Sequence, residues 1–183
     1  MDDLSADETA PSGVVIRLLT EEDAEAYAEL RRDSLRQAPL AFASSPGDDF
    51  ASNPAALREQ FRQAPESAIF GAFHEQLVGS IGIYRDRHLK ASHKAHIWGM
   101  YVVPSSRRSG VGSRLLDAAL RHAESLSGVS WVHLSVSSAA PEAQKLYESV
   151  GFRPWGTEPD ALRYAGQTVS ELHMAIRLAW LAT

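Results

Sequence analysis

The alternation of strand and helix patterns after residue 95 is the feature of this sequence that most limits its fold. A mostly apolar run at 95–103 ends at Pro104, which cannot continue the hydrogen-bonding ladder of a strand. Residues 111–126 then carry apolar side chains at helical spacing. A strand at 131–137, a helix at 141–150 and a strand at 152–155 are expected next. This order predicts an α/β fold in which a parallel strand pair is covered by helices.

The pattern before residue 95 predicts a helix, a long loop and a hairpin. Thr20 is suited to cap a helix at 21–37, and the Pro- and Gly-containing segment 38–53 is expected to be a loop. Gly99, inside the apolar run, suggests a β-bulge. Further strands are expected at 14–19, 68–73, 77–84 and 168–178, with a short helix beginning near Pro54. We expect a disordered acidic tail at 1–12 and a single domain at 13–183.

Composition narrows the class of protein. The chain has 183 residues, 44% of them hydrophobic, and no cysteine. Disulfides, thiolate metal sites and a cysteine nucleophile are therefore excluded. No apolar run approaches the ~20 residues that span a bilayer, and the first residues lack the pattern of a signal peptide. The expected location is the cytoplasm, with no membrane partner and no bound metal.

Charge is distributed unevenly along the chain. The formal net charge is -5, yet residues 85–121 contain eight Lys and Arg against two Asp. General nucleic-acid binding usually shows a basic excess over a whole domain, which this sequence lacks. A local site for a small anion is the better interpretation, and no nucleic-acid partner is expected.

The turn between the apolar run and the following helix carries the most specific chemistry. It reads Arg107, Arg108, Ser109, Gly110, Val111 and Gly112. Glycines at a helix start let backbone N–H groups approach a ligand, and the helix dipole favours an anion there. This is the construction of a pyrophosphate site, although an ordinary strand-to-helix turn with solvated arginines fits the same residues. The turn lacks the Lys-Ser/Thr of a P-loop and the third Gly of a dinucleotide fingerprint.

These residues resemble the GNAT superfamily of N-acetyltransferases. The family pattern [Gln/Arg]-x-x-Gly-x-[Gly/Ala] is met by Arg107, Gly110 and Gly112. It follows the strand residues Trp98–Val102, and the segment Leu146–Phe152 comes at the expected distance after it. The resemblance covers most of residues 14–178.

The resemblance implies direct transfer of an acetyl group from acetyl-CoA to the amine of a small molecule or peptide. The pantetheine arm would be bound by the backbone of Val102, Val103 and Pro104. The pyrophosphate would be held by Arg107 to Gly112. The implied fold is a mixed, mostly antiparallel central sheet with a central parallel pair, flanked by helices. Homodimers are common in the superfamily, so a dimer is one option for this chain.

The resemblance also assigns an acid, and it leaves the base open. Tyr147 occupies the position of the family's general acid, which protonates the departing thiolate; the residue-based alternative is a core aromatic. The glutamates that serve as bases in family members are absent, and His96 and Ser135 stand at those positions. His96 or an ordered water would accept the amine proton. Ala140 replaces an asparagine that binds the cofactor in many members.

Two other functions remain as alternatives from the sequence. A non-catalytic acyl-CoA-binding regulatory module would keep the phosphate turn without an efficient base. The residues His88, Lys90, His93 and Lys94 could instead form an RNA surface or a metal patch, although a solvated loop is the more frequent meaning of such a run. The identity of the amine is not encoded in any motif.

Overall fold

Seven strands of the described residues form one sheet in the order β1-β2-β3-β4-β5-β7-β6. The computed structural model describes residues 13–178; the expected tail at 1–12 lies outside them, as do residues 179–183. The strands are β1 (Val15–Leu18), β2 (Ser67–His74), β3 (Gln76–Arg85), β4 (Lys94–Val102), β5 (Trp131–Ser137), β6 (Arg153–Tyr164) and β7 (Gln167–Arg177). Only β4 and β5 are parallel, which confirms the expected mixed sheet with a central parallel pair.

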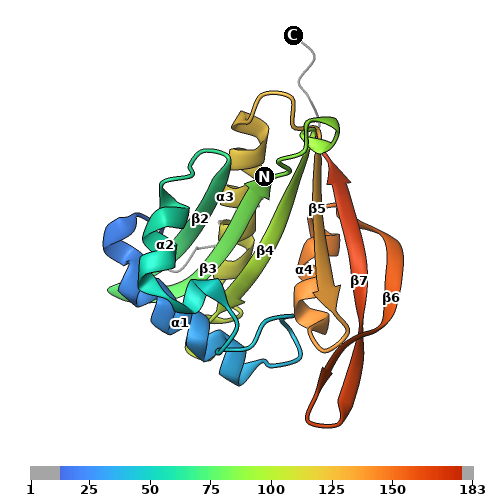
Figure 1. The fold of residues 1–183 in the computed structure, drawn as a ribbon, viewed down its shortest axis with the longest axis horizontal. Coiled ribbons are helices and arrows are strands. Elements are labelled where there is room, and N and C mark those ends of the chain that lie inside the picture. The colour runs from blue at the N-terminus through green and yellow to red at the C-terminus, as the bar shows by residue number, and fades with distance from the viewer. Residues whose placement is uncertain (1–12, 179–183) are drawn as a thin grey trace, which may run out of the picture.

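Helices cover both faces of the sheet (Figure 1). They are α1 (Ala24–Gln37), α2 (Pro54–Phe61), α3 (Val111–Ser125) and α4 (Pro141–Ser149). The main core includes Leu115 and Leu116 of α3 and Tyr147 of α4, packed against strand residues such as Ile81 and Val132. A smaller core holds Tyr27 of α1 and Leu57 of α2 against Ile69 of β2. The sheet is therefore held between two hydrophobic cores.

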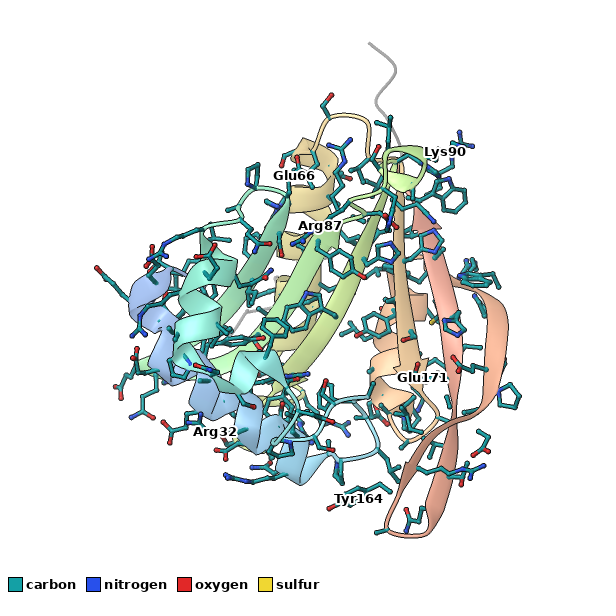
Figure 2. The ribbon with its side chains drawn as sticks, viewed as in Figure 1. Arg32, Glu66, Arg87, Lys90, Tyr164 and Glu171 are labelled. Atoms are coloured by element: carbon teal, nitrogen blue, oxygen red, sulfur yellow. The ribbon has the colours of Figure 1, made fainter. Side chains whose placement is uncertain are left out.

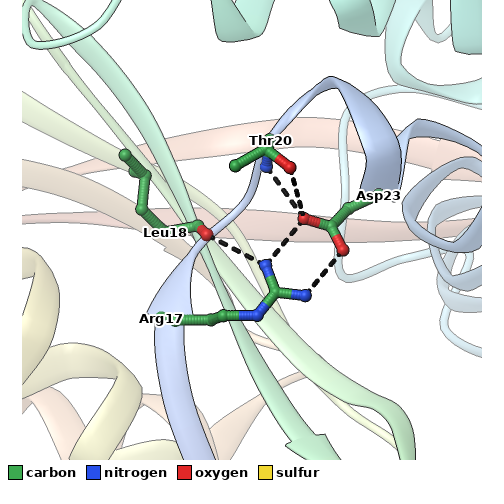
Figure 3. A network of polar contacts seen from close by, with 4 residues as sticks. All are labelled: Arg17, Leu18, Thr20 and Asp23. Carbon is green, nitrogen blue, oxygen red and sulfur yellow. Dashed lines mark hydrogen bonds and ion pairs between the residues drawn. The ribbon is translucent and has the colours of Figure 1, made fainter.

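A polar network joins the end of β1 to the start of α1 (Figure 3). The Asp23 carboxylate accepts hydrogen bonds from the Thr20 N–H at 2.8 Å and from Arg17 Nη1 and Nη2 at 2.7 and 2.8 Å. Thr20 precedes the helix as expected. The first turn, Glu21–Asp23, is a 3₁₀ helix, and the α-helix begins at Ala24.

The strand β6 is longer than the sequence pattern indicates. The expected strand at 152–155 extends to Tyr164 and pairs with β7 at the edge of the sheet. An edge strand needs no continuous apolar pattern and tolerates proline, as at Pro154 and Pro159. Periodicity therefore did not extend the expected strand beyond Trp155, where the structure has a mostly exposed, irregular strand with a register shift between Glu158 and Leu162.

Candidate active site

The parallel strands β4 and β5 part in the middle of the sheet. Their pairing covers only Lys94–His96 with Trp131–His133, after which the two strands diverge (Figure 1). Beyond this point the edge of β4 that faces β5 has no strand partner. The backbone and side chains that follow His96 are therefore available to line an opening between the two strands.

The expected bulge at Gly99 is confirmed and lies on this part of β4. Gly99 has a φ of +62°, and the register with β3 shifts between Ser80 and Gly82. A Cβ at Gly99 would lie 3.4 Å from Arg31 Nη1. Arg31 is 6% exposed and its guanidinium donates to Asp49 Oδ2 at 2.7 Å. A buried ion pair from α1 and the following loop thus packs under the bulge.

At the end of β4, the backbone N–H of Val102 points toward β5. Val103 donates its N–H to the Val78 carbonyl at 2.9 Å, so Val103 faces β3. Because backbone groups alternate along a strand, those of Val102 point to the opposite side, toward β5. The Val102 carbonyl accepts a 2.9 Å hydrogen bond from Arg107 Nε. Pro104 has no N–H, and its carbonyl accepts from the Arg107 backbone at 3.3 Å.

The turn from Arg107 to Gly112 combines a left-handed glycine with the start of α3. Gly110 precedes α3 in the left-handed region, with a φ of +78° and no atom within 4 Å of the place where a Cβ would lie. The first-turn N–H groups of α3, beginning with Val111, have no carbonyl acceptor within the helix. Arg108 also has a positive φ, of 60°, and the Ser109 hydroxyl closes the turn by donating to the Ser106 carbonyl at 2.7 Å.

Gly112 lies in a closely packed position. A Cβ there would lie 3.2 Å from Met100 Cε and 3.3 Å from Leu146 Cδ2. Its missing side chain lets the start of α3 approach β4 and α4 closely. The two glycines therefore have different physical roles, with open space beside Gly110 and close contact at Gly112. Open space, free N–H groups and two arginines suit a pyrophosphate.

Tyr147 lies where α4 meets the diverging part of β4. It is 5% exposed, its ring packs against Phe152, and its hydroxyl contacts Met100 Sδ at 3.4 Å. Burial raises the pKa of the Tyr147 phenol above its ordinary value near 10. The hydroxyl therefore keeps its proton at neutral pH. The ring belongs to the core, as the residue-based alternative predicts, and the hydroxyl lies beside β4.

His96 lies on the opposite face of β4 from the main core, in a pocket of about 310 Å³. We call this the ring pocket, because aromatic and imidazole rings from five strands make up most of its wall. Its lining residues are Tyr84, His96, Ile97, Trp98, His133, Leu134, Ser135, Trp155 and His173. The His96 ring stacks on Tyr84 at 5.0 Å and lies 5.7 Å from His133.

Asp86 is the acidic neighbour of His96. Its Oδ2 lies 3.4 Å from His96 Nε2, without the alignment of a hydrogen bond. Its Oδ1 accepts the His88 backbone N–H at 3.1 Å. Burial lowers the pKa of His96 and outweighs the opposing effect of Asp86. Burial also lowers the pKa of His133, so both imidazoles are mainly neutral at pH 7.

A second, larger hollow of about 690 Å³ adjoins the ring pocket, and the two share Tyr84 and Trp98. We call it the outer hollow. Its charged lining residues are Glu66, Arg85, Asp86 and Arg87. Figure 2 shows Glu66 and Arg87 toward the upper end of the view, with Lys90 beyond them. The outer hollow thus carries both signs of charge.

The basic segment 85–121 is split by the fold. Arg85, Arg87 and Lys90 precede β4, whereas Arg107 and Arg108 follow it. A strand of nine residues is roughly 30 Å long, so the two groups lie at opposite ends of β4. The positive excess of the sequence is therefore not one patch, and only part of it can act at the turn.

Sequence reasoning found His96 and Ser135 in the ring pocket and missed most of its other functional groups. His133 in the wall and Asp86 beside it come from different elements, and no local motif joins them to His96. The register of the parallel pair, which sets His96 beside His133, is the signal that could have identified His133. Among residues 13–178, no cluster of three or more His, Asp or Glu side chains is arranged to hold a metal. No helix in this range is long and apolar enough to cross a membrane.

Comparison with known proteins assigns the family. The family model described as Acetyltransferase (GNAT) family matches residues 25–152. A mycothiol acetyltransferase from Nocardiopsis dassonvillei is 44% identical over 62 residues, which are 32% of this chain and 18% of that protein. The chain thus aligns with less than a fifth of this relative's length.

Solved structures agree in fold. A Salmonella typhimurium protein, yncA, solved with its cofactor acetyl-CoA, matches with a TM-score of 0.80 and 18% identity over 94% of this chain and 98% of that chain. A GCN5-related N-acetyltransferase from Kribbella flavida gives a TM-score of 0.78 and 24% identity, covering 92% of this chain and 99% of that chain. With the family model spanning well over half of its residues, the chain belongs to the GNAT family of acetyltransferases.

Proposed function

We propose that this chain is an acetyl-CoA-dependent N-acetyltransferase that transfers the acetyl group directly to the amine of a small molecule or peptide. Membership of the GNAT family and the acetyl-CoA bound to the structurally similar Salmonella protein support the donor. The observation that carries the proposal is the position of the Tyr147 hydroxyl against Met100, two residues before Val102 on the strand that leads into the turn. The proposed acid on α4 and the proposed backbone donor and anion site at the end of β4 would thus lie in sequence beside the cofactor.

The turn is the proposed site for the cofactor's pyrophosphate. Hydrogen bonds would come from the backbone N–H groups of Ser109, Gly110, Val111 and Gly112. Positive charge would come from Arg107 and Arg108. The pantetheine arm would then run along the backbone of Val102, Val103 and Pro104 toward Met100. The Val102 N–H would polarise the thioester carbonyl, and one such donor can lower a barrier by about 3 kcal/mol.

His96 is the proposed proton acceptor, directly or through a water molecule. It removes one proton from the ammonium, and the freed amine attacks the carbonyl carbon of the thioester. The new C–N bond forms as the C–S bond breaks, and Tyr147 gives its proton to the leaving sulfur. Tyr147 recovers a proton as the attacking nitrogen loses its second one. The balance is one amide, one free thiol and one proton released to solvent.

The test is release of CoA thiol with a panel of amines, comparing wild type with Tyr147→Phe. The hydroxyl makes only a weak sulfur contact, so the variant should fold. We expect kcat to fall by about 10²- to 10⁴-fold, with the Kd for acetyl-CoA unchanged. Acetyl-CoA binding without thiol release for any amine would contradict the proposal and favour a non-catalytic acyl-CoA-binding module.

A further inference from the structure

The wall of the ring pocket, as residues 13–178 form it, is rich in rings and lacks cationic Lys and Arg side chains. Six of its lining residues carry rings, and no Lys or Arg lines it among the described residues. The faces of the Tyr and Trp rings attract a cation, whereas the imidazole, indole and hydroxyl groups of the wall can donate hydrogen bonds to an anion but supply no Lys or Arg charge. The wall therefore suits an ammonium group better than a carboxylate.

The two carboxylates closest to the wall also favour a cationic ligand. Asp86 lies 3.4 Å from His96, and Glu158 Oε2 lies 3.4 Å from His173 Nε2. Each carboxylate is thus adjacent to an imidazole of the wall. His96 and His133 are mainly neutral because burial lowers their pKa. An anion entering the pocket would meet two carboxylates nearby and no cation in the described wall itself, although the Lys94 ammonium is close enough to lower the pKa of both imidazoles.

The separation between the amine and a negative group on the same substrate decides which compounds this preference excludes. The carboxylate of an α-amino acid is attached to the carbon that bears the amine, so it must enter the same pocket of about 310 Å³. Arg85 and Arg87 line only the outer hollow, where Arg85 donates to the Ser92 carbonyl and Arg87 to Gln63. A negative group would have to extend from the ring pocket into the outer hollow to reach them.

We propose that the acceptor is a small amine with an apolar or aromatic body and no anionic group beside the amine. This inference rests on the proposed transferase function and specifies its substrate. It selects simple aralkyl amines over free α-amino acids. The selection comes from the ring pocket and is independent of how the donor is held.

The test compares 2-phenylethylamine, phenylalaninamide and phenylalanine, which share one ring and differ at the carbon beside the amine. The first two should have kcat/KM values within about 10-fold of each other, because neither carries a carboxylate. Phenylalanine should be at least 50-fold lower. Equal kcat/KM for phenylalanine and phenylalaninamide would overturn the inference.

A matched pair of variants tests the cause. Ser135→Lys places a cation in the wall, and Ser135→Gln adds length without charge. The ratio of phenylalanine to phenylalaninamide activity should rise at least 10-fold in Ser135→Lys and stay constant in Ser135→Gln. A ratio that is unchanged in both variants would show that charge in the pocket does not set the selection.

Binding without turnover separates this inference from the proposed function. Trp98 and Trp155 line the pocket, so their fluorescence reports on occupancy. Quenching by 2-phenylethylamine at concentrations at least 10-fold below those needed for phenylalanine supports the inference even if no acetyl group is transferred. Equal quenching by both ligands, or by neither, overturns it even if some other amine is acetylated.

Discussion

The two ends of β4 are built in different ways. The turn that follows Val102 is a short continuous segment whose properties come from backbone geometry and two glycines. The ring pocket around His96 is assembled from side chains on β3, β4, β5, β6 and β7. A donor shared by a whole family suits a fixed backbone device, whereas an acceptor that varies suits a wall of exchangeable side chains. The comparison predicts that substitutions at one end leave the other intact.

The largest expected effect is on stability and concerns the support of the bulge between the two ends. Asp49→Ala would leave the Arg31 guanidinium buried without its partner, and Asp49 also accepts the Ala51 N–H at 2.8 Å. We expect a loss of about 3–5 kcal/mol in the free energy of unfolding, measured by urea titration. Asp48→Ala, at the exposed neighbouring position, should cost under about 1 kcal/mol. Similar losses for both variants would show that the buried ion pair does not stabilise the bulge.

A smaller effect, on the KM of the acceptor, is expected at the ring pocket. Trp155 is 63% exposed, so Trp155→Ala should change the free energy of unfolding by less than about 0.5 kcal/mol. The acceptor KM should rise about 10-fold, equivalent to about 1.4 kcal/mol, while the Kd for acetyl-CoA stays the same. Trp131→Ala is the control, because Trp131 is 37% exposed and lies outside the pocket wall. A changed acetyl-CoA affinity in Trp155→Ala would contradict the separation of the two ends.

The smallest effect concerns the base. The groups facing His96 are Tyr84, Asp86, Lys94 and His133, and only Asp86 raises its pKa. Asp86→Asn keeps an acceptor for the His88 N–H, so the turn should persist. The His96 pKa should fall further below 6.5, which moves the acidic limb of the pH–rate profile to lower pH. We expect kcat at pH 7 to fall roughly 3- to 10-fold, because the base is weaker.

The control for Asp86→Asn is Asp117→Asn, which makes the same change of charge in an exposed ion pair on α3. Titration of the His96 imidazole by NMR measures the pKa whether or not an amine is acetylated. A pKa of His96 that is the same in wild type and Asp86→Asn would remove Asp86 from the proposed mechanism.

The sequence predicted the turn after β4 better than the ring pocket, and the reason is physical. Helix spacing, the Gly-x-Gly turn and the bulge at Gly99 are local features, and the structure confirms those elements. The partners of His96 depend on strand register, which no single segment encodes. The edge strand β6 was predicted too short because its residues need to satisfy only one neighbour. The basic segment appeared continuous in sequence, although β4 separates its two groups of cations in space.

The central claim is that the backbone turn at Gly110 holds the pyrophosphate of acetyl-CoA. Calorimetric titration with acetyl-CoA, comparing Gly110→Asp with Gly110→Asn, tests it most directly. Both side chains tolerate a positive φ and would enter open space, so the two variants differ mainly in charge. We predict that Gly110→Asp weakens binding at least 30-fold relative to Gly110→Asn, with 2-phenylethylamine quenching unchanged in both. Equal affinity for acetyl-CoA in the two variants would contradict the assignment of the turn.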